Sequence, residues 1–310
     1  MLLSKFLDPK NDFAFKQIFG TEKNKNILVH FINDVMKFEG SDKIHDVAFL
    51  TTAQNPDIAY LKQSLVDVLC TDEKGYQYII EMQVAKTSGF EKRAQYYAAK
   101  AYSRQLNCGE DYTQLKAVIF IAITDFIMLP NTPDYRSTHI ILDEKTYNHD
   151  LKDFSYTFLE LPKFHKSIDE LSTLIEKWMY FFKHAEETSE EDLRRIVGSD
   201  EIIYQAYEAL NRFSWSEIEL NTYEQEEKRE RDAQAIIKQK LIDAKEEGKV
   251  EGKAEGKVEG KAEGKADERK HFVRILLRKG WSDESIIDNL EITSHELSII
   301  KKELDLESDA

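Results

Sequence analysis

The sequence predicts an α/β fold in which a mixed β-sheet is flanked by helices, followed by a helical region and a helical C-terminal tail. Three observations predict this class. Strand-like apolar runs recur through residues 1–165, a helical pattern separates two of these runs, and strand patterns are missing beyond residue 165. Because a strand–helix–strand order brings the chain back across the sheet, we expect these two strands to be parallel.

The first two elements are expected to be helices. In residues 8–20, Asp8 has the position of an N-cap, Pro9 that of the first helical residue, and Gly20 marks the end. A second helix is expected over residues 25–36.

Strand-like runs follow at 46–52, 63–70, 76–84, 116–124, 138–144 and 154–161. The run at 116–124 is apolar on both faces, which is typical of a buried central strand. A helix over 89–106 precedes it, and Ser88 with Glu91 forms a capping-box pattern that predicts a helix start near Gly89.

We therefore expect four segments. Residues 1–165 form the sheet core, 166–246 an acidic helical region, 247–266 a repeat, and 267–310 a small tail with helix-turn-helix-like spacing. The repeat has five copies of Glu-Gly-Lys-(Val/Ala). It is either a flexible or marginally helical spacer, or a helix that oligomerises by burying its apolar column and pairing Glu with Lys. The tail is equally compatible with a small helical pack or dimer element.

Composition excludes several classes of protein. A formal net charge of -15 argues against a simple basic nucleic-acid coat protein. No apolar run approaches the ~20 residues that span a bilayer, and the N-terminal residues become charged too early for a signal peptide. Cys70 and Cys108 are far apart and lack metal-binding spacing, so we expect a reduced, cytoplasmic protein without structural zinc.

Two carboxylates interrupt the apolar residues of a predicted hairpin, residues 66–83. If residues 73–75 form a three-residue turn with Gly75 in the left-handed conformation, Asp67 lies opposite Glu81. Opposed residues in an antiparallel pair have Cβ atoms about 4.5–5.5 Å apart, so the two charges repel unless a cation lies between them.

A divalent cation would resolve this repulsion, since Mg²⁺ takes oxygen ligands, often one or two carboxylates. Gln83 shares the face of Glu81 and adds an amide group. Two alternatives stay open at this point. Asp67 and Glu81 could lie on a solvent-facing strand surface, or an even-numbered turn could place them on opposite faces.

The helix after this hairpin carries a basic and aromatic stripe. At ~100° per residue, Arg93, Tyr97, Lys100 and Arg104 fall on one side of the helix. Cations can follow phosphates, and tyrosines can stack on bases or bond to the backbone. Such a stripe can bind a nucleic acid, and the alternative is a solvated helix face with the tyrosines partly in the core.

In combination these segments resemble the recombination-promoting nuclease (Rpn) family of transposase-like proteins, within the PD-(D/E)XK nuclease superfamily. The matching segments are "KNDFAFKQIFG", "VDVLCTDEKG", "YIIEMQ" and "KRAQYYAAKAYSRQL". A glycine-punctuated charged repeat near the C-terminus also recurs in that group. The resemblance implies a restriction-endonuclease-like fold and magnesium-dependent DNA cleavage, with manganese as a substitute.

The resemblance also implies roles for single residues. Asp67 and Glu81 would be the metal ligands, Gln83 would take the place of the superfamily's catalytic lysine, and Asp12 would lie near the site as an accessory residue. The chain departs from the superfamily pattern at Val66, where a proline is usual, and at Gln83, which carries no charge. Any stabilisation of phosphate charge must then come from the metal or from basic residues of the stripe.

The leading hypothesis is a DNA endonuclease that promotes recombination or transposition-like events. The alternative is a non-catalytic nucleic-acid or protein-binding module on a decayed nuclease fold, which would not bind the metal. A third hypothesis is an oligomerising scaffold, a homo-oligomer formed through residues 247–310.

Overall fold

The computed structural model describes residues 4–54 and 64–308 and divides into two compact units, Met1–Glu230 and Arg231–Ala310. The division into four segments stays a prediction.

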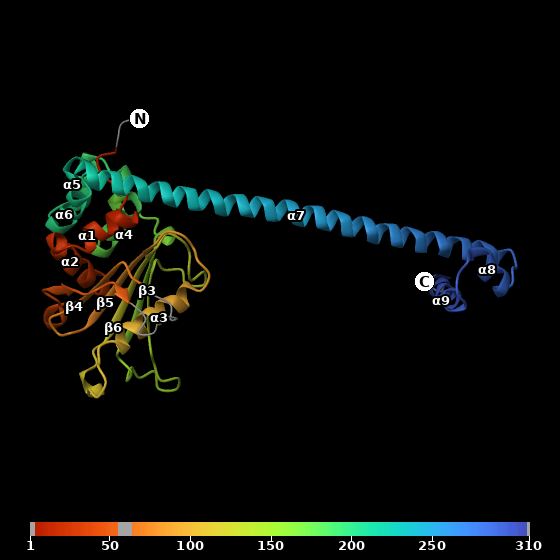
Figure 1. The fold of residues 1–310 in the computed structure, drawn as a ribbon, viewed down its shortest axis with the longest axis horizontal. Coiled ribbons are helices and arrows are strands. Elements are labelled where there is room, and N and C mark those ends of the chain that lie inside the picture. Colours follow the sequence, from red (N-terminus) through yellow and green to blue (C-terminus); the bar gives the residue numbers. More distant parts are fainter. Residues whose placement is uncertain (1–3, 55–63, 309–310) are drawn as a thin grey trace. The chain divides into compact units, whose positions relative to one another are not determined.

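The first unit contains a six-stranded mixed sheet, as predicted (Figure 1). The three adjacent strands β5, β6 and β8 are parallel, and the other neighbours are antiparallel. In the order of pairing, the strands are β1 (Val47–Phe49), β4 (Val68–Asp72), β5 (Gln77–Gln83), β6 (Val118–Thr124), β8 (Phe154–Glu160) and β7 (Arg136–Ile140). β2 (Ala53–Gln54) and β3 (Ser64–Leu65) form a separate pair.

The central strand is β6, which is buried along its whole length, as its apolar sequence predicts. The predicted strand at 63–70 is instead interrupted before β4, so that Asp67 lies just outside the ladder.

Helices cover both faces of the sheet. One face packs on α3 (Phe90–Ser103), whose alanines allow it to approach closely. The other face shares a larger core with α1 (Asp12–Phe19), α2 (Lys25–Met36), α4 (Leu174–His184), α5 (Glu190–Val197) and α6 (Glu201–Ala209).

One predicted helix start and one predicted capping box are wrong. Asn11, not Asp8, is the N-cap of α1 and accepts hydrogen bonds from the amides of Phe13 and Ala14. A turn in which Asn11 N donates to Asp8 O at 3.2 Å delays the helix. For α3, the predicted start near Gly89 is confirmed, but the Ser88–Glu91 capping box is wrong: the N-cap is Gly89 with φ +76° and no side-chain cap, because Ser88 lies one residue too early.

The 62-residue helix α7 (Glu217–Arg278) begins in the first unit and continues into the second, where it includes the repeat. Helices α8 (Asp283–Leu290) and α9 (Ser294–Ser308) follow and share a small core with the end of α7. Although α7 is long, neither it nor any other described helix has an apolar stretch that could cross a bilayer.

Candidate active site at the Asp67–Glu81 hairpin

The hairpin has the predicted three-residue turn. The amide of Asp72 donates to the carbonyl of Tyr76 at 3.0 Å, and Gly75 has φ +86°. Pairing of Val68 with Ile80 sets the register, and the next pair outward is Asp67 opposite Glu81. The alternative of an even-numbered turn is therefore wrong.

Each carboxylate is held by the backbone of the opposing segment. Asp67 N donates to Glu81 Oε1 at 3.2 Å, and Met82 N donates to Asp67 Oδ2 at 2.9 Å. Glu81 is only 5% exposed, so the alternative of a solvent-facing strand surface is also wrong. These two hydrogen bonds fix the carboxylates beside each other, despite their like charge.

The local environment disfavours two negative charges. Burial raises the pKa of Asp67 to about 6, against the opposing influence of the Met82 amide and the Lys16 ammonium. Burial and the charge of Asp67 raise the pKa of Glu81 well above its ordinary value, with Arg93 and Lys16 opposing. The site thus lacks enough positive charge to balance both carboxylates.

Helix α1 brings Asp12 and Lys16 to this site. Lys16 Nζ lies 2.6 and 2.8 Å from the two carboxylate oxygens of Asp12 and 3.5 Å from Asp67 Oδ1. Sequence analysis placed Asp12 near the site but missed Lys16. The four-residue spacing of Asp12 and Lys16 does predict that the two side chains share one face of the helix. It does not predict which part of the fold that face contacts.

Helix α3 brings Arg93 and Tyr97 to the other side of the pair. Arg93 donates through Nη2 to Gln83 Oε1, and its guanidinium lies 4.9 Å from the ring centre of Phe90 and 6.0 Å from that of Tyr97. The Nε of Arg93 is buried and lacks a hydrogen-bond partner among the residues that the structure describes. Charges on Asp67 and Glu81 contribute to a raised pKa of Tyr97, mainly caused by burial.

The rest of the stripe continues away from the carboxylates. Lys100 lies over the ring of Tyr96, with Nζ 5.8 Å from its centre, and Arg104 is the exposed C-cap residue of α3. Arg93 and Tyr97 are therefore the stripe residues that belong to the site itself, whereas Lys100 and Arg104 extend it along the helix.

The chemistry of the carboxylate pair fits a hard divalent cation. Within residues 4–54 and 64–308, no group of three or more His, Cys, Asp and Glu side chains is placed to hold a metal. Mg²⁺ often needs only one or two carboxylates, because it keeps several waters. The neighbouring carboxylates of Asp67 and Glu81 meet that requirement.

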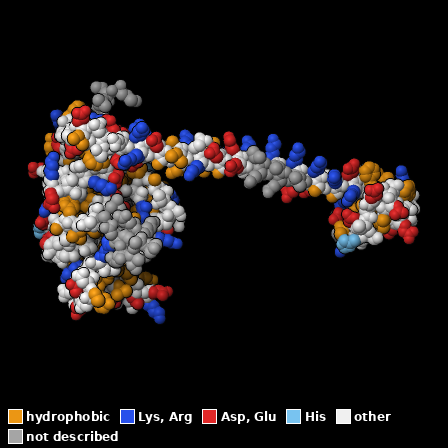
Figure 2. Space-filling model, viewed as in Figure 1, with side chains coloured by type: hydrophobic (Ala, Val, Ile, Leu, Met, Phe, Trp, Pro, Cys, Tyr) orange, Lys and Arg blue, Asp and Glu red, His pale blue; other side chains and the backbone are white. Residues whose placement is uncertain are grey.

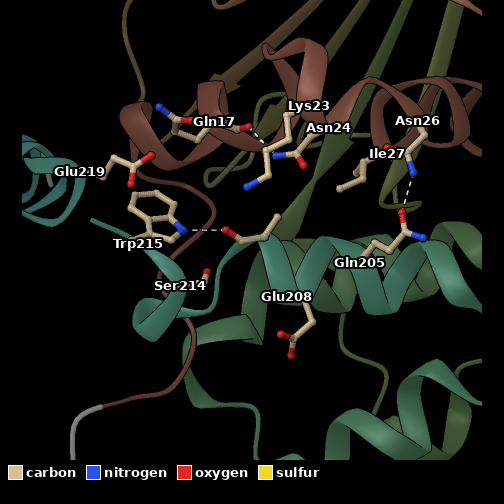
Figure 3. Close-up of a pocket in the computed structure, with 11 residues that line it drawn as sticks. Gln17, Lys23, Asn24, Asn26, Ile27, Gln205, Glu208, Ser214, Trp215 and Glu219 are labelled. Atoms are coloured by element: carbon tan, nitrogen blue, oxygen red, sulfur yellow. Dashed lines mark hydrogen bonds between the residues drawn. The ribbon is translucent and has the colours of Figure 1, made fainter. Parts of the chain in front are cut away.

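A separate pocket with a volume of ≈ 460 Å³ lies where the helices of the first unit meet (Figure 3). Its polar groups largely bind one another: Trp215 Nε1 donates to Ala209 O at 2.7 Å, and Asn26 donates to Gln205. The described lining lacks every predicted site residue, and consists of Gln17, Lys23, Asn24, Asn26, Ile27, Gln205, Glu208, Ala209, Ser214, Trp215 and Glu219.

Comparison with known proteins agrees with the fold. No curated protein and no solved structure gives a significant match. The family model of the PD-(D/E)XK nuclease family transposases matches residues 9–240, which include every predicted site residue. This match covers most of the chain, and the protein therefore belongs to the PD-(D/E)XK nuclease family of transposases.

Proposed function

We propose that this protein is a divalent-metal-dependent DNA endonuclease that promotes recombination or transposition-like events. The observation that carries the proposal is the buried pair Asp67 and Glu81, opposed across the hairpin and held by each other's backbone. Two carboxylates confined in this way are unfavourable by themselves and favourable around a cation.

Asp67 and Glu81 would hold Mg²⁺ or Mn²⁺. When bound, such an ion lowers the pKa of a water molecule and polarises a phosphodiester oxygen. Gln83 cannot supply positive charge, but its side chain is oriented by Arg93 and offers an amide for hydrogen bonding to a water or a phosphate oxygen. Asp12 assists from α1 by holding Lys16 beside the pair.

The stripe Arg93, Tyr97, Lys100 and Arg104 is proposed to hold the DNA backbone. Lys92 and Lys86 add to the same region, so that residues 86–104 have five basic residues and one acidic residue. This local balance differs from the net charge of -15 of the whole chain and supports attraction of a polyanion to this helix.

Plasmid cleavage tests the proposal. Wild type and Asp67→Asn are compared with Mg²⁺, Mn²⁺ or a chelator, because the amide keeps the acceptor for Met82 N but loses the charge. We expect metal-dependent nicking by the wild type alone. Cleavage that Asp67→Asn retains would exclude this site.

One observation favours the non-catalytic alternative: Gln83 stands where the superfamily has a lysine, and it is tied to Arg93. A binding module on a decayed nuclease fold would bind DNA without taking up the cation. Calorimetric titration of the wild type with Mn²⁺ separates the two functions, since heat of binding that Asp67→Asn removes supports the nuclease.

We also infer that residues 247–310, which include the end of α7 together with α8 and α9, mediate homo-oligomerisation. Between residues 231 and 269, every described side chain of α7 is exposed, including Ile237 (62%) and Leu241 (71%) ahead of the repeat. Figure 2 shows charged side chains along this helix. In the repeat, Glu and Lys meet their own kind four residues on, which destabilises a lone helix. Truncation at Lys245 should lower the number of subunits, obtained by dividing the mass from light scattering by the mass of one chain, and an unchanged number of subunits would remove this inference.

A further inference from the structure

Lys16 has one firm contact and one loose contact in the candidate site. Its ammonium group lies 2.6 and 2.8 Å from the Asp12 oxygens, within hydrogen-bond distance, but 3.5 Å from Asp67 Oδ1. The lysine side chain is 34% exposed and that of Asp67 is 16% exposed. Lys16 is thus anchored at Asp12 and reaches from there to the buried pair.

This arrangement differs from an ordinary ion pair on a helix surface. An Asp and a Lys four residues apart satisfy each other without a third partner. Here the ammonium group also faces a carboxylate from the hairpin. Because Met82 N already bonds to Asp67 Oδ2, Lys16 lies against the oxygen that the backbone leaves available.

We propose that Lys16 is a displaceable counter-ion of Asp67. In the absence of a divalent cation, Lys16 partly neutralises Asp67 and so reduces the repulsion between the two buried carboxylates. When the cation binds, Lys16 gives up Asp67 Oδ1 and stays attached to Asp12. This inference rests on the proposed function, since it assumes that Asp67 is a metal ligand, and it makes Lys16 a positioning residue.

The two positive charges therefore compete for the same oxygen. A divalent ion held by Asp67 would repel the ammonium group of Lys16. The cost of displacing Lys16 would make the free energy of cation binding less favourable. Removing the lysine charge should consequently tighten cation binding. A merely structural role predicts the opposite, because loosening of α1 against the hairpin would weaken the site.

Mn²⁺ titration of the full-length protein by calorimetry, with every variant at the same pH of about 8, tests this inference. The variants are Lys16→Met, which removes the charge, Lys16→Gln, which keeps a polar side chain if the first fails to fold, and Lys16→Arg, which keeps the charge. Lys23→Met is the matched control, since Lys23 is an exposed lysine of the following 3₁₀-helix Glu22–Asn24.

We expect Lys16→Met and Lys16→Gln to lower the Kd for Mn²⁺ by about three- to tenfold, as removal of a nearby like charge would. Lys16→Arg and Lys23→Met should bind as the wild type does. Equal or weaker binding by folded Lys16→Met and Lys16→Gln, with a wild type that binds Mn²⁺, overturns this inference alone. A wild type that takes up no Mn²⁺ overturns the proposed function and this inference together.

Discussion

Glu81 and Glu160 are two buried glutamates near the C-terminal ends of parallel strands, β5 and β8, on either side of β6. Their exposed fractions are 5% and 1%. Glu160 forms an ion pair with Lys163, whose side chain is 8% exposed, and accepts a hydrogen bond from Leu129 N at 2.9 Å and another from Met128 N. Glu81 instead faces Asp67.

The difference between them lies in charge balance, since their burial is nearly equal. Besides pairing with Glu160, Lys163 donates hydrogen bonds to the carbonyls of Leu129 and Thr132 at 2.7 and 2.6 Å. Glu160 therefore holds the segment after β6 in place. Its own negative charge is already paired with the ammonium group of Lys163. A buried carboxylate indicates a functional site when its neighbours leave it short of positive charge.

The largest expected contrast is in cleavage. Glu81→Gln should lower the rate of plasmid nicking by about 10²–10³-fold, comparable to the loss of a group that stabilises charge in a transition state. Glu160→Gln should lower the rate of nicking only in proportion to the fraction of the protein that is unfolded. Rates are measured under conditions where circular dichroism shows both variants folded, and equal losses would abolish the distinction between the two glutamates.

Stability should show the reverse contrast. Glu160→Gln leaves the ammonium group of Lys163 without its carboxylate, and we expect the free energy of unfolding to fall by about 3 kcal/mol. Urea denaturation with a chelator present measures this change. Asp150→Asn, at an exposed acid, is the control and should leave the midpoint unchanged. A Glu160→Gln protein as stable as the wild type would mean that this ion pair is not needed for the fold.

Glu81→Gln should stabilise the metal-free protein at neutral and higher pH. Because the pKa of Glu81 is raised in the folded state, the folded protein holds this proton more tightly than the unfolded chain does. Wild-type stability therefore falls as the pH rises from the unfolded pKa to the folded pKa. The variant escapes this loss, so we expect a gain of at least about 1 kcal/mol at about pH 8 that vanishes toward about pH 4.

Thermal unfolding of both proteins across this pH range, with a chelator, measures the gain. Excess Mn²⁺ should reverse its sign, because only the wild type can bind the ion with both carboxylates. A gain that is independent of pH would point to better packing of the amide and would remove the electrostatic explanation.

The smallest effect is expected for a cation outside the pair. Lys100→Gln should leave stability unchanged but weaken DNA binding and reduce the slope of log K against log salt by about 1. Fluorescence anisotropy at several salt concentrations provides the slope. Lys152→Gln, at an exposed lysine outside α3, is the control. Equal slopes for both variants would remove Lys100 from the proposed DNA surface.

Local patterns in the sequence predicted much of the fold. The apolar run of β6 gave its central position, the helix between β5 and β6 gave their parallel direction, and Gly75 gave the turn that sets Asp67 opposite Glu81. These features are set by residues close together in the sequence. For such residues, secondary-structure propensity and spacing predict the local conformation.

The remainder depended on contacts between distant segments. Nothing in the spacing of α1 predicts that Lys16 reaches Asp67, and nothing in β8 predicts that Lys163 neutralises Glu160. The two predicted N-caps failed for a local reason: a turn at Asp8 moves the cap of α1 to Asn11, and a left-handed Gly89 takes the cap position of α3 in place of Ser88. The roles of the site residues stay predictions until the variants are measured.

The reach of Lys16 from α1 to the hairpin has a consequence for the newly made chain. The ribosome releases α1 long before β5, so Asp12 and Lys16 exist for a time without the carboxylates that they later serve. The site comes together only when the sheet closes against the helical layer. A nascent or misfolded copy therefore lacks the assembled carboxylate site.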